Sequence, residues 1–396
     1  AIIEAGKKAM DDGFTKYTAG PGMIELREAI CEKLKRENGL FYDPVDILVS
    51  NGEKQSLYNA CQAIFNPSDS VIVFSPYWVS FPEFVKMADA EPVLVNTLPE
   101  SNFEPDFEDL DAKINSSIKG VIINSPSNPT GGVWRNDAIV KLLKLAKKHG
   151  WVVISDECYE RLVYDGAFTS AEKLNQAHDI GATVLTCMSL SKTYAMTGWR
   201  IGYSAGPKDI IKAMSKIQGQ ATSCANSIGQ KASIEALIGD QTCVEDMKSL
   251  FLKRRDLIVE LLNDLPGVKC ANPKGAFYVF PDFSSYLNQK VNGKLLKDTF
   301  DISRVRSGDV CHTVYTLNDS LPQFLIYEIN AKEYALFDID SLSAHIIELP
   351  VHNEVIIVKG TINKGGSISS VLSDSITDYN LALALENQMI NIFAWS

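Results

Sequence analysis

The chain has 396 residues, of which 45% are hydrophobic and 22% are charged, and its formal net charge is −11. This composition is typical of globular proteins, and the length predicts two or three domains. The negative net charge argues against general binding to nucleic acid or to an anionic membrane surface, although a locally positive pocket can still bind a small anion.

Strand-like and helix-like segments alternate over the first half of the chain. Apolar runs that end in turn residues predict strands within 45–52, 69–78, 118–132, 150–159 and 182–192. Apolar residues at helical spacing predict helices over 53–65 and 136–150. Strands that are apolar on both faces and separated by helices indicate an α/β fold, with a mainly parallel sheet sandwiched by helices.

The pattern changes toward the C-terminus. Segment 243–268 predicts a long amphipathic helix that ends at Pro266 and Gly267, and segment 275–283 predicts a strand. After about residue 286 the sequence indicates a β-rich region. Strands are expected within 324–340 and 353–362, and a closing helix is expected over 381–393.

Cysteine usage and the start of the chain bear on its location. The eight cysteines include no CxxC pair, which argues against a zinc site or a redox motif, so we expect no metal. Reduced cytoplasmic thiols are our interpretation. The first residues, AIIEAGKKAMDDG, have too short an apolar stretch for a signal peptide, and no run approaches the roughly 18 apolar residues of a membrane span. We expect a cytoplasmic protein with no membrane partner.

Five chemically distinctive residues each follow a strand-like run. They are Glu53, Trp78, Asn128, Asp156 and Lys192. Ligands of open parallel sheets bind beyond the carboxyl ends of the strands, so this shared placement predicts a ligand site.

Asp156 ends the segment GWVVISD, where a carboxylate would be half buried. Most such aspartates only cap a helix or a turn. A buried carboxylate can also stabilise a protonated ring nitrogen through a charge-assisted hydrogen bond. Tyr159 lies three residues further on and would present its hydroxyl on the same face.

The stretch SLSKTYAMTGWRIGY places Lys192 and Arg200 in a segment that otherwise predicts partial burial. A lysine in a loop is usually a solvated charge, but a desolvated lysine becomes a nucleophile that can form an imine. Arg200 and the hydroxyls of Ser189 and Ser191 could donate to a phosphate. The glycine turn at Gly52, which opens a helix, could offer backbone N–H groups to the same anion.

Two further side chains complete the candidate site. Trp78 could stack on a ring, although a lone tryptophan more often packs in a core. Asn128 precedes Pro129 and is restricted to extended backbone conformations, which could aim its amide at a ligand oxygen. A partner for a ring nitrogen, a stacking indole, a phosphate cradle and an imine-forming lysine together match pyridoxal phosphate.

The sequence resembles the class I aminotransferases, which are fold type I pyridoxal-phosphate enzymes, and it is most similar to the aspartate and aromatic aminotransferase branch. The resemblance covers about residues 14–283. Seven motifs carry it, in the family's order: KYTAGPGMIELREAI, SNGEKQSLYNA, SPYWVSFPE, NSPSNPTGGV, SDECYERLVYDG, SLSKTYAMTGWRIGY and GAFYVF. Seven motifs in order are far more specific than any one of them.

The resemblance implies roles for three catalytic residues. Lys192 would bind the cofactor as an imine and move the proton between the substrate α-carbon and the cofactor. Asp156 would keep the pyridine nitrogen protonated. Tyr159, together with Asn128, would hydrogen-bond the phenolic oxygen of the cofactor.

The resemblance also implies the remaining cofactor contacts. Trp78 would stack on the ring. The phosphate would be bound by Gly52, Glu53, Lys54, Ser189 and Arg200, the first two chiefly through backbone N–H groups. Tyr17 matches a tyrosine that reaches the phosphate of the neighbouring subunit, which implies a homodimer. The implied substrates are an amino acid and a 2-oxo acid such as 2-oxoglutarate.

The last 110 or so residues do not match the family. No segment after residue 286 resembles the family segment whose arginine grips the substrate carboxylate, and Arg304 and Arg306 lack its context. We expect an N-terminal arm without the family's first segment at 1–16, a large cofactor-binding domain at 17–245, an interdomain helix with the start of a small domain at 246–285, and an atypical region at 286–396.

Three functions remain open at this point. The first is transfer of an amino group from an aspartate-type or aromatic amino acid. The second is C–S bond cleavage or elimination with the same cofactor. The third is a cofactor-binding pseudoenzyme that has lost its substrate arginine.

Overall fold

The computed structural model describes residues 1–287 and the strands at 290–291, 294–295, 311–314, 324–328, 333–338 and 343–348. The chain divides into two compact units, Ala1–Ser285 and Tyr286–Ser396. The strand expected within 353–362 and the helix expected over 381–393 lie outside the described residues.

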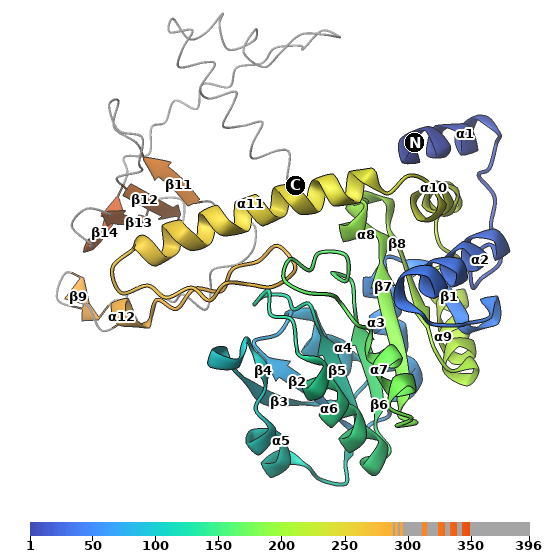
Figure 1. Cartoon of the computed structure of the whole chain (residues 1–396), viewed down its shortest axis with the longest axis horizontal. Coiled ribbons are helices and arrows are strands. Elements are labelled where there is room, and N and C mark those ends of the chain that lie inside the picture. Colours follow the sequence, from blue (N-terminus) through green and yellow to red (C-terminus); the bar gives the residue numbers. More distant parts are fainter. Residues whose placement is uncertain are drawn as a thin grey trace, which may run out of the picture. The chain divides into compact units, whose positions relative to one another are not determined.

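The first unit is built on one eight-stranded sheet in the order β1-β8-β7-β6-β5-β2-β3-β4 (Figure 1). Its strands are β1 (Ile47–Asn51), β2 (Ser70–Ser75), β3 (Glu91–Leu98), β4 (Glu104–Pro105), β5 (Ile118–Asn124), β6 (Val152–Asp156), β7 (Thr183–Ser189) and β8 (Ile201–Ala205). β8 runs antiparallel to β1 and β7, and β4 runs antiparallel to β3, whereas the other neighbouring strands pair in parallel. The expected mainly parallel α/β sheet is therefore confirmed.

Helices precede, connect and follow these strands. The α-helices are α1 (Ile2–Asp11), α2 (Ile24–Lys33), α3 (Glu53–Ile64), α4 (Ser80–Met87), α5 (Phe107–Lys113), α6 (Asn136–His149), α7 (Ala171–Ala177), α8 (Leu190–Thr193), α9 (Lys208–Ala221), α10 (Ser227–Ile238), α11 (Thr242–Asp264) and α12 (Ser284–Leu287). Short π or 3-10 turns are η1 (Leu34–Asn38), η2 (Pro44–Asp46), η3 (Pro99–Ser101) and η4 (Thr197–Trp199). No helix within the described residues combines the length and apolarity needed to cross a membrane.

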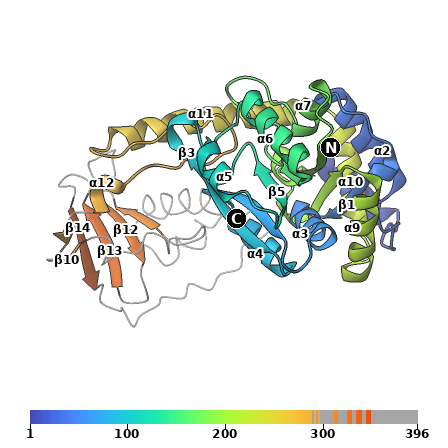
Figure 2. The ribbon, with the colours of Figure 1, turned by 90° about the horizontal axis from the view of Figure 1, so that it is seen from below.

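Two hydrophobic layers cover the two faces of the sheet. Side chains alternate along each strand, so Val121 and Val153 join the core beneath α6 and α7, whereas Ile122 and Ile154 join the core beneath α3, α4 and α9. Figure 2 shows these two helix layers on opposite sides of the strands. The continuous apolar runs of the sequence result from burial on both faces.

Two predictions concern the segment that follows the sheet, and one of them is confirmed while the other is wrong. The long helix expected at 243–268 is α11. The strand expected at 275–283 does not form, and only Gly275 and Asp282 make isolated bridges. The backbone N–H groups of Gly275 and Ala276 instead donate to the carbonyls of Gly131 and Leu162, at 3.0 and 2.8 Å. These bonds to loops replace a strand ladder.

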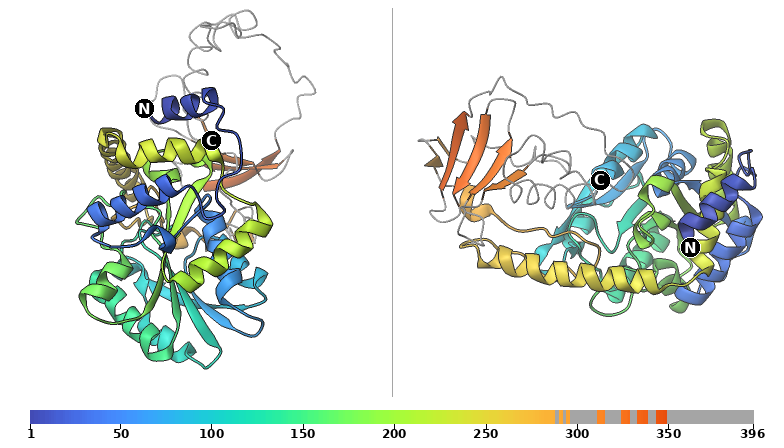
Figure 3. Two further views of the ribbon diagram at one scale, coloured as in Figure 1. Left: turned by 90° about the vertical axis from the view of Figure 1, so that its right-hand side faces the viewer. Right: turned by 90° about the horizontal axis from the view of Figure 1, so that it is seen from above.

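In the described part of the second unit, strands form the secondary structure. β9 (Lys290–Val291) pairs with β10 (Lys294–Leu295). A four-stranded antiparallel sheet contains β11 (Cys311–Val314), β12 (Phe324–Glu328), β13 (Glu333–Asp338) and β14 (Ser343–Glu348), and its strands lie side by side (Figure 3). The strands expected within 324–340 are β12 and β13.

Gly202 of β8 allows the start of α3 to approach the sheet. A Cβ atom at this position would overlap the backbone nitrogen and Cα of Glu53, and backbone atoms have no room to move aside. We predict that Gly202→Ala lowers the free energy of unfolding by at least about 2 kcal/mol.

Gly198→Ala is the matched control, because a Cβ atom there meets nothing within 4 Å. It should change the unfolding free energy by no more than about 0.5 kcal/mol. Denaturant titration of the two variants measures both values, and equal effects would contradict the proposed close packing.

Candidate functional site

One edge of the large sheet gathers the loops that carry the candidate site residues. The parallel register places Asn124, Asp156 and Cys187 side by side near the carboxyl ends of β5, β6 and β7. The antiparallel β8 begins at the same edge, because Gly202 pairs with Ser189. β1 and β2 also end at this edge, so the segments after five strands and before β8 converge there.

The start of α3 and the arginine before β8 form a cradle with anion-binding character. Gly52 has φ +74°, and a Cβ atom there would overlap the guanidinium of Arg200. No side chain caps the N-terminus of α3, so its positive dipole end faces the arginine without a competing side-chain acceptor. Ser189 accepts a hydrogen bond from the backbone N–H of Ser191 at 3.0 Å, which leaves its own O–H able to donate. These groups can bind a phosphate.

Asp156 is 4% exposed and is bound into the turn that follows β6. Its Oδ1 accepts a hydrogen bond from the backbone N–H of Cys158 at 3.2 Å. Burial raises the pKa of its carboxyl to about 6, while hydrogen bonds from neighbouring groups oppose that rise. A ligand cation that pairs with this carboxylate would be shielded from water.

Three side chains meet beside this turn through their polar ends. The hydroxyls of Tyr159 and Tyr278 lie 2.7 Å apart, and the amide of Asn128 donates to the Tyr278 hydroxyl at 3.1 Å. Burial raises the pKa of the Tyr159 hydroxyl, so it acts as a hydrogen-bonding group rather than an anion. The peptide between Asn128 and Pro129 is cis.

Lys192 lies in α8, directly after β7, and is half buried. Its Nζ is 5.4 Å from the centroid of the Phe277 ring. Its positive charge also acts on the buried Cys158 thiol. The amine therefore faces the turn that carries Asp156 and Tyr159, and an aromatic ring covers one side of it.

Of three further residues expected at the site, two have other contacts in this structure and the third is exposed. Trp78 packs edge-on against Phe81 and Phe84, with centroids 5.4 and 6.0 Å away. The Nζ of Lys54 lies 4.9 Å from the Trp78 centroid. Tyr17 is 85% exposed. The cofactor contacts expected of these residues remain predictions.

Two features of the site are not predicted from the sequence: the contacts of Tyr278 and the burial of the Glu53 side chain. Tyr278 belongs to the motif GAFYVF, but its contacts with Asn128 and Tyr159 depend on a chain reversal that no local pattern predicts. Glu53 was expected to act chiefly through its backbone, yet its side chain is buried beside Asp156. A carboxylate as the first residue of a helix is usually an exposed dipole partner, so the sequence carries no signal of this burial.

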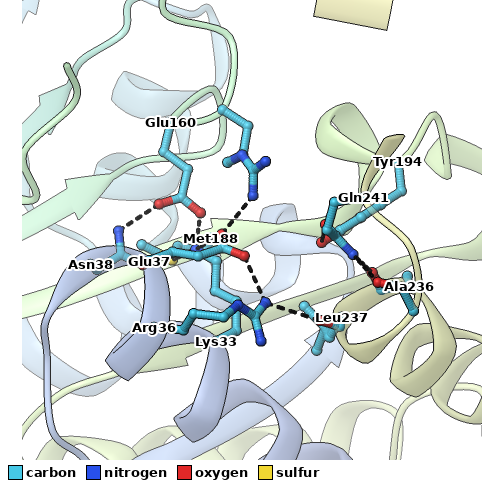
Figure 4. A network of polar contacts seen from close by, with 12 residues as sticks. Lys33, Arg36, Glu37, Asn38, Glu160, Met188, Tyr194, Ala236, Leu237 and Gln241 are labelled. Carbon is cyan, nitrogen blue, oxygen red and sulfur yellow. Dashed lines mark hydrogen bonds and ion pairs between the residues drawn. The ribbon is translucent and has the colours of Figure 1, made fainter. Parts of the chain in front are cut away.

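A buried polar network fixes the position of this turn from its other side (Figure 4). The Nζ of Lys33 bonds to the carboxylate of Glu160 and lies 3.0 Å from Oδ1 of Asn38. The amide of Asn38 donates to the second oxygen of Glu160 at 2.6 Å. Arg161 forms a 2.9 Å ion pair with Glu37. The network ties α2 and η1 to the two residues that follow Tyr159.

Comparison with known proteins identifies the family. A family model described as aminotransferase class I and II matches residues 1–311. The aspartate/prephenate aminotransferase of Cereibacter sphaeroides is 46% identical over 294 residues, which cover 74% of this chain and 73% of that protein. The corresponding protein of Thermus thermophilus is 44% identical over 286 residues, covering 72% and 73% of the two chains.

Solved structures agree with this result. The aspartate aminotransferase of Thermus thermophilus with maleate is 43% identical and has a TM-score of 0.68, covering 72% of this chain and 74% of that one. The aspartate aminotransferase of Rhizobium meliloti is 40% identical with a TM-score of 0.72, covering 75% and 76%. The chain belongs to the class I and II aminotransferases, and its large domain has the fold type I architecture.

The buried network gives a stability prediction. The side chains of Lys33 and Glu160 are only 4% and 8% exposed, so Lys33→Ala leaves a buried carboxylate without its cation. We expect the free energy of unfolding to fall by about 3–5 kcal/mol.

Lys7→Ala serves as the control, since Lys7 pairs with Glu4 at 2.8 Å on the surface, where the two side chains are 59% and 70% exposed. Its effect should not exceed about 0.5 kcal/mol. Thermal and denaturant unfolding of both variants provide the comparison, and a mild effect of Lys33→Ala would mean that the network contributes little.

Proposed function

We propose that this protein is a pyridoxal-phosphate-dependent aminotransferase that moves an amino group between an aspartate-type or aromatic amino acid and a 2-oxo acid such as 2-oxoglutarate. The observation that supports it most is the convergence of Lys192, buried Asp156 and the Gly52–Arg200 cradle at one sheet edge. The names of the aspartate and prephenate aminotransferase relatives support the substrate class.

The described residues fit the cofactor chemically. The uncapped N-terminus of α3, Arg200 and Ser189 would hold the phosphate. Asp156 would pair with the ring nitrogen, and Tyr159 and Asn128 would donate to the phenolic oxygen. When bound, the cofactor supplies an electron sink for the carbanion that forms at the substrate α-carbon.

Each side chain then has a defined task. Asp156 holds a proton on the ring nitrogen, because its buried negative charge favours the cationic ring. Lys192 Nζ would accept the proton from the substrate α-carbon and deliver it to the cofactor, which requires a neutral amine. Arg200 and the N-terminus of α3 would hold the phosphate end of the cofactor. Lys192 Nζ and the substrate α-carbon would then stay in reacting geometry. The Phe277 ring, whose centroid lies 5.4 Å from Lys192 Nζ, covers one side of that amine.

The assembly and location of the protein are also proposed here. Tyr17 is exposed in the single chain and would reach the phosphate of a second copy, which supports a homodimer with shared sites. A cytoplasmic location is consistent with the seven described cysteines, which are free thiols. The substrate-carboxylate arginine is not assigned, because Arg304 and Arg306 lie outside the described residues.

Lys192 gives the first functional prediction. Borohydride reduction of the loaded protein should fix the cofactor on Lys192 alone, and Lys192→Ala should lose all covalent attachment, because Lys192 follows β7 at the sheet edge where Asp156 lies. Mass mapping of proteolytic fragments provides the test. A label on a different lysine of the wild-type chain would overturn the assignment.

Asp156 gives the second functional prediction. Asp156→Ala should retain part of the cofactor through the phosphate contacts but lose most activity, by roughly a hundredfold or more, because the ring nitrogen loses its charge partner. Single-turnover spectra with an added amino acid measure the rate. Glu83→Gln is the control, since Glu83 is 62% exposed and pairs only with Lys86. Near-normal turnover of the Asp156 variant would rule out the assigned role.

A further inference from the structure

A second carboxyl group lies beside Asp156. Glu53 is the first residue of α3, and its side chain is 8% exposed. Its carboxyl oxygen, a carboxyl oxygen of Asp156 and Sγ of Cys158 all lie within 4.8 Å of one another, and all three residues are buried. One oxygen of Glu53, Oε1, has no hydrogen-bond partner among the described residues.

Two carboxylates this close in a buried place cannot both be ionised without a cation between them. The other titratable groups that interact with this pair are Glu157, the thiols of Cys158 and Cys187, and the hydroxyls of Tyr159 and Tyr278. The charge of Lys192 acts on the neighbouring Cys158 thiol, and no lysine or arginine of the described residues is among the main influences on either carboxyl. One proton must therefore remain on the carboxyl pair.

The surroundings decide which carboxyl holds this proton. Burial, followed by the Asp156 charge, raises the pKa of Glu53 well above its ordinary value. Burial raises the pKa of Asp156 less, to about 6, because the neighbouring Glu53 carboxyl and the backbone N–H of Cys158, which donates to Oδ1, both favour its charged form. The proton is therefore more stable on Glu53.

We propose that Glu53 is a positioning residue that remains a neutral carboxylic acid and donates a hydrogen bond to Asp156, which keeps Asp156 ionised and oriented toward the ring nitrogen. The role in orienting a ring rests on the proposed function, whereas the shared proton does not. This role explains why Glu53 is the first residue of α3. From that position its backbone N–H would contribute to the phosphate cradle, and its side chain would extend to the opposite end of the ligand.

The shared proton can be tested on the full chain without cofactor. Because the pKa of Glu53 is raised on folding, the folded state binds more protons than the unfolded state above pH ~4.3, and stability falls as the pH rises. The side chain of the Glu53→Gln variant cannot ionise, so this variant does not lose stability in this way as the pH rises. The unfolding constant of the wild type, divided by that of the variant, should rise with pH above ~4.3, by up to about tenfold per pH unit.

Glu157→Gln is the matched control for that measurement. Glu157 is also buried, and burial raises the pKa of its carboxyl to about 7. Its Oε1 accepts hydrogen bonds from the hydroxyls of Ser155 and Ser170 and from the backbone N–H of Ala171. The corresponding ratio for Glu157→Gln should level off near pH 7. A Glu53→Gln ratio that does not change with pH would overturn the shared proton.

The positioning role needs a second measurement, which is the affinity of the full chain for pyridoxal phosphate by equilibrium dialysis. Glu53→Gln keeps a donor and should bind within about threefold of the wild type. Glu53→Ala removes a hydrogen bond to a charged group and should bind at least about tenfold more weakly. Circular dichroism of both variants controls for folding.

Two results would overturn the positioning role: wild-type affinity of Glu53→Ala, or an affinity of Glu53→Gln as weak as that of Glu53→Ala. A wild-type chain that takes up no pyridoxal phosphate would contradict the proposed function and the positioning role together. In that case the pH comparison would still test whether the carboxyl pair holds a proton.

Discussion

The burial of one carboxylate, Asp156, is the constraint on which the rest of the site depends. An isolated carboxylate at 4% exposure would be strongly destabilising, so the fold must supply hydrogen bonds, a cationic ligand, or both. The backbone N–H of Cys158 supplies one bond, and Glu53 lies close enough to supply another. A ligand that carries a proton on a ring nitrogen would best offset the remaining free-energy cost of burying this carboxylate.

The surroundings of Asp156 have to be rigid for this arrangement to work. The sheet register fixes the end of β6 between β5 and β7. The turn that follows is fixed from the far side by the Lys33–Glu160 contact. The close approach of Gly202 to the first residue of α3 brings the cradle of Gly52 and Arg200 to the same edge. Side-chain packing, strand pairing and a buried ion pair thus together fix the positions of the atoms around Asp156.

Much of this arrangement follows from sequence patterns. Apolar runs on both sheet faces predict parallel strands, and the residues after them, including Asp156 and Lys192, converge at one edge as expected. Contacts between distant segments are not predicted in this way. Tyr278 reaches Tyr159 across 119 positions of the sequence, and the expected strand at 275–283 is replaced by bonds to the loops at Gly131 and Leu162. The burial of Glu53 follows from its neighbours in space, because its helix position alone predicts exposure.

The most direct test of this account is the protonation state of the ring nitrogen in the loaded protein. Nitrogen NMR of the full chain bound to ¹⁵N-labelled pyridoxal phosphate reports that state across the pH range in which the protein is folded. If Asp156 is the buried anionic partner, the nitrogen stays protonated well above the pH at which the free cofactor loses this proton. An unprotonated nitrogen at neutral pH, or a titration that follows the free cofactor, would contradict the account.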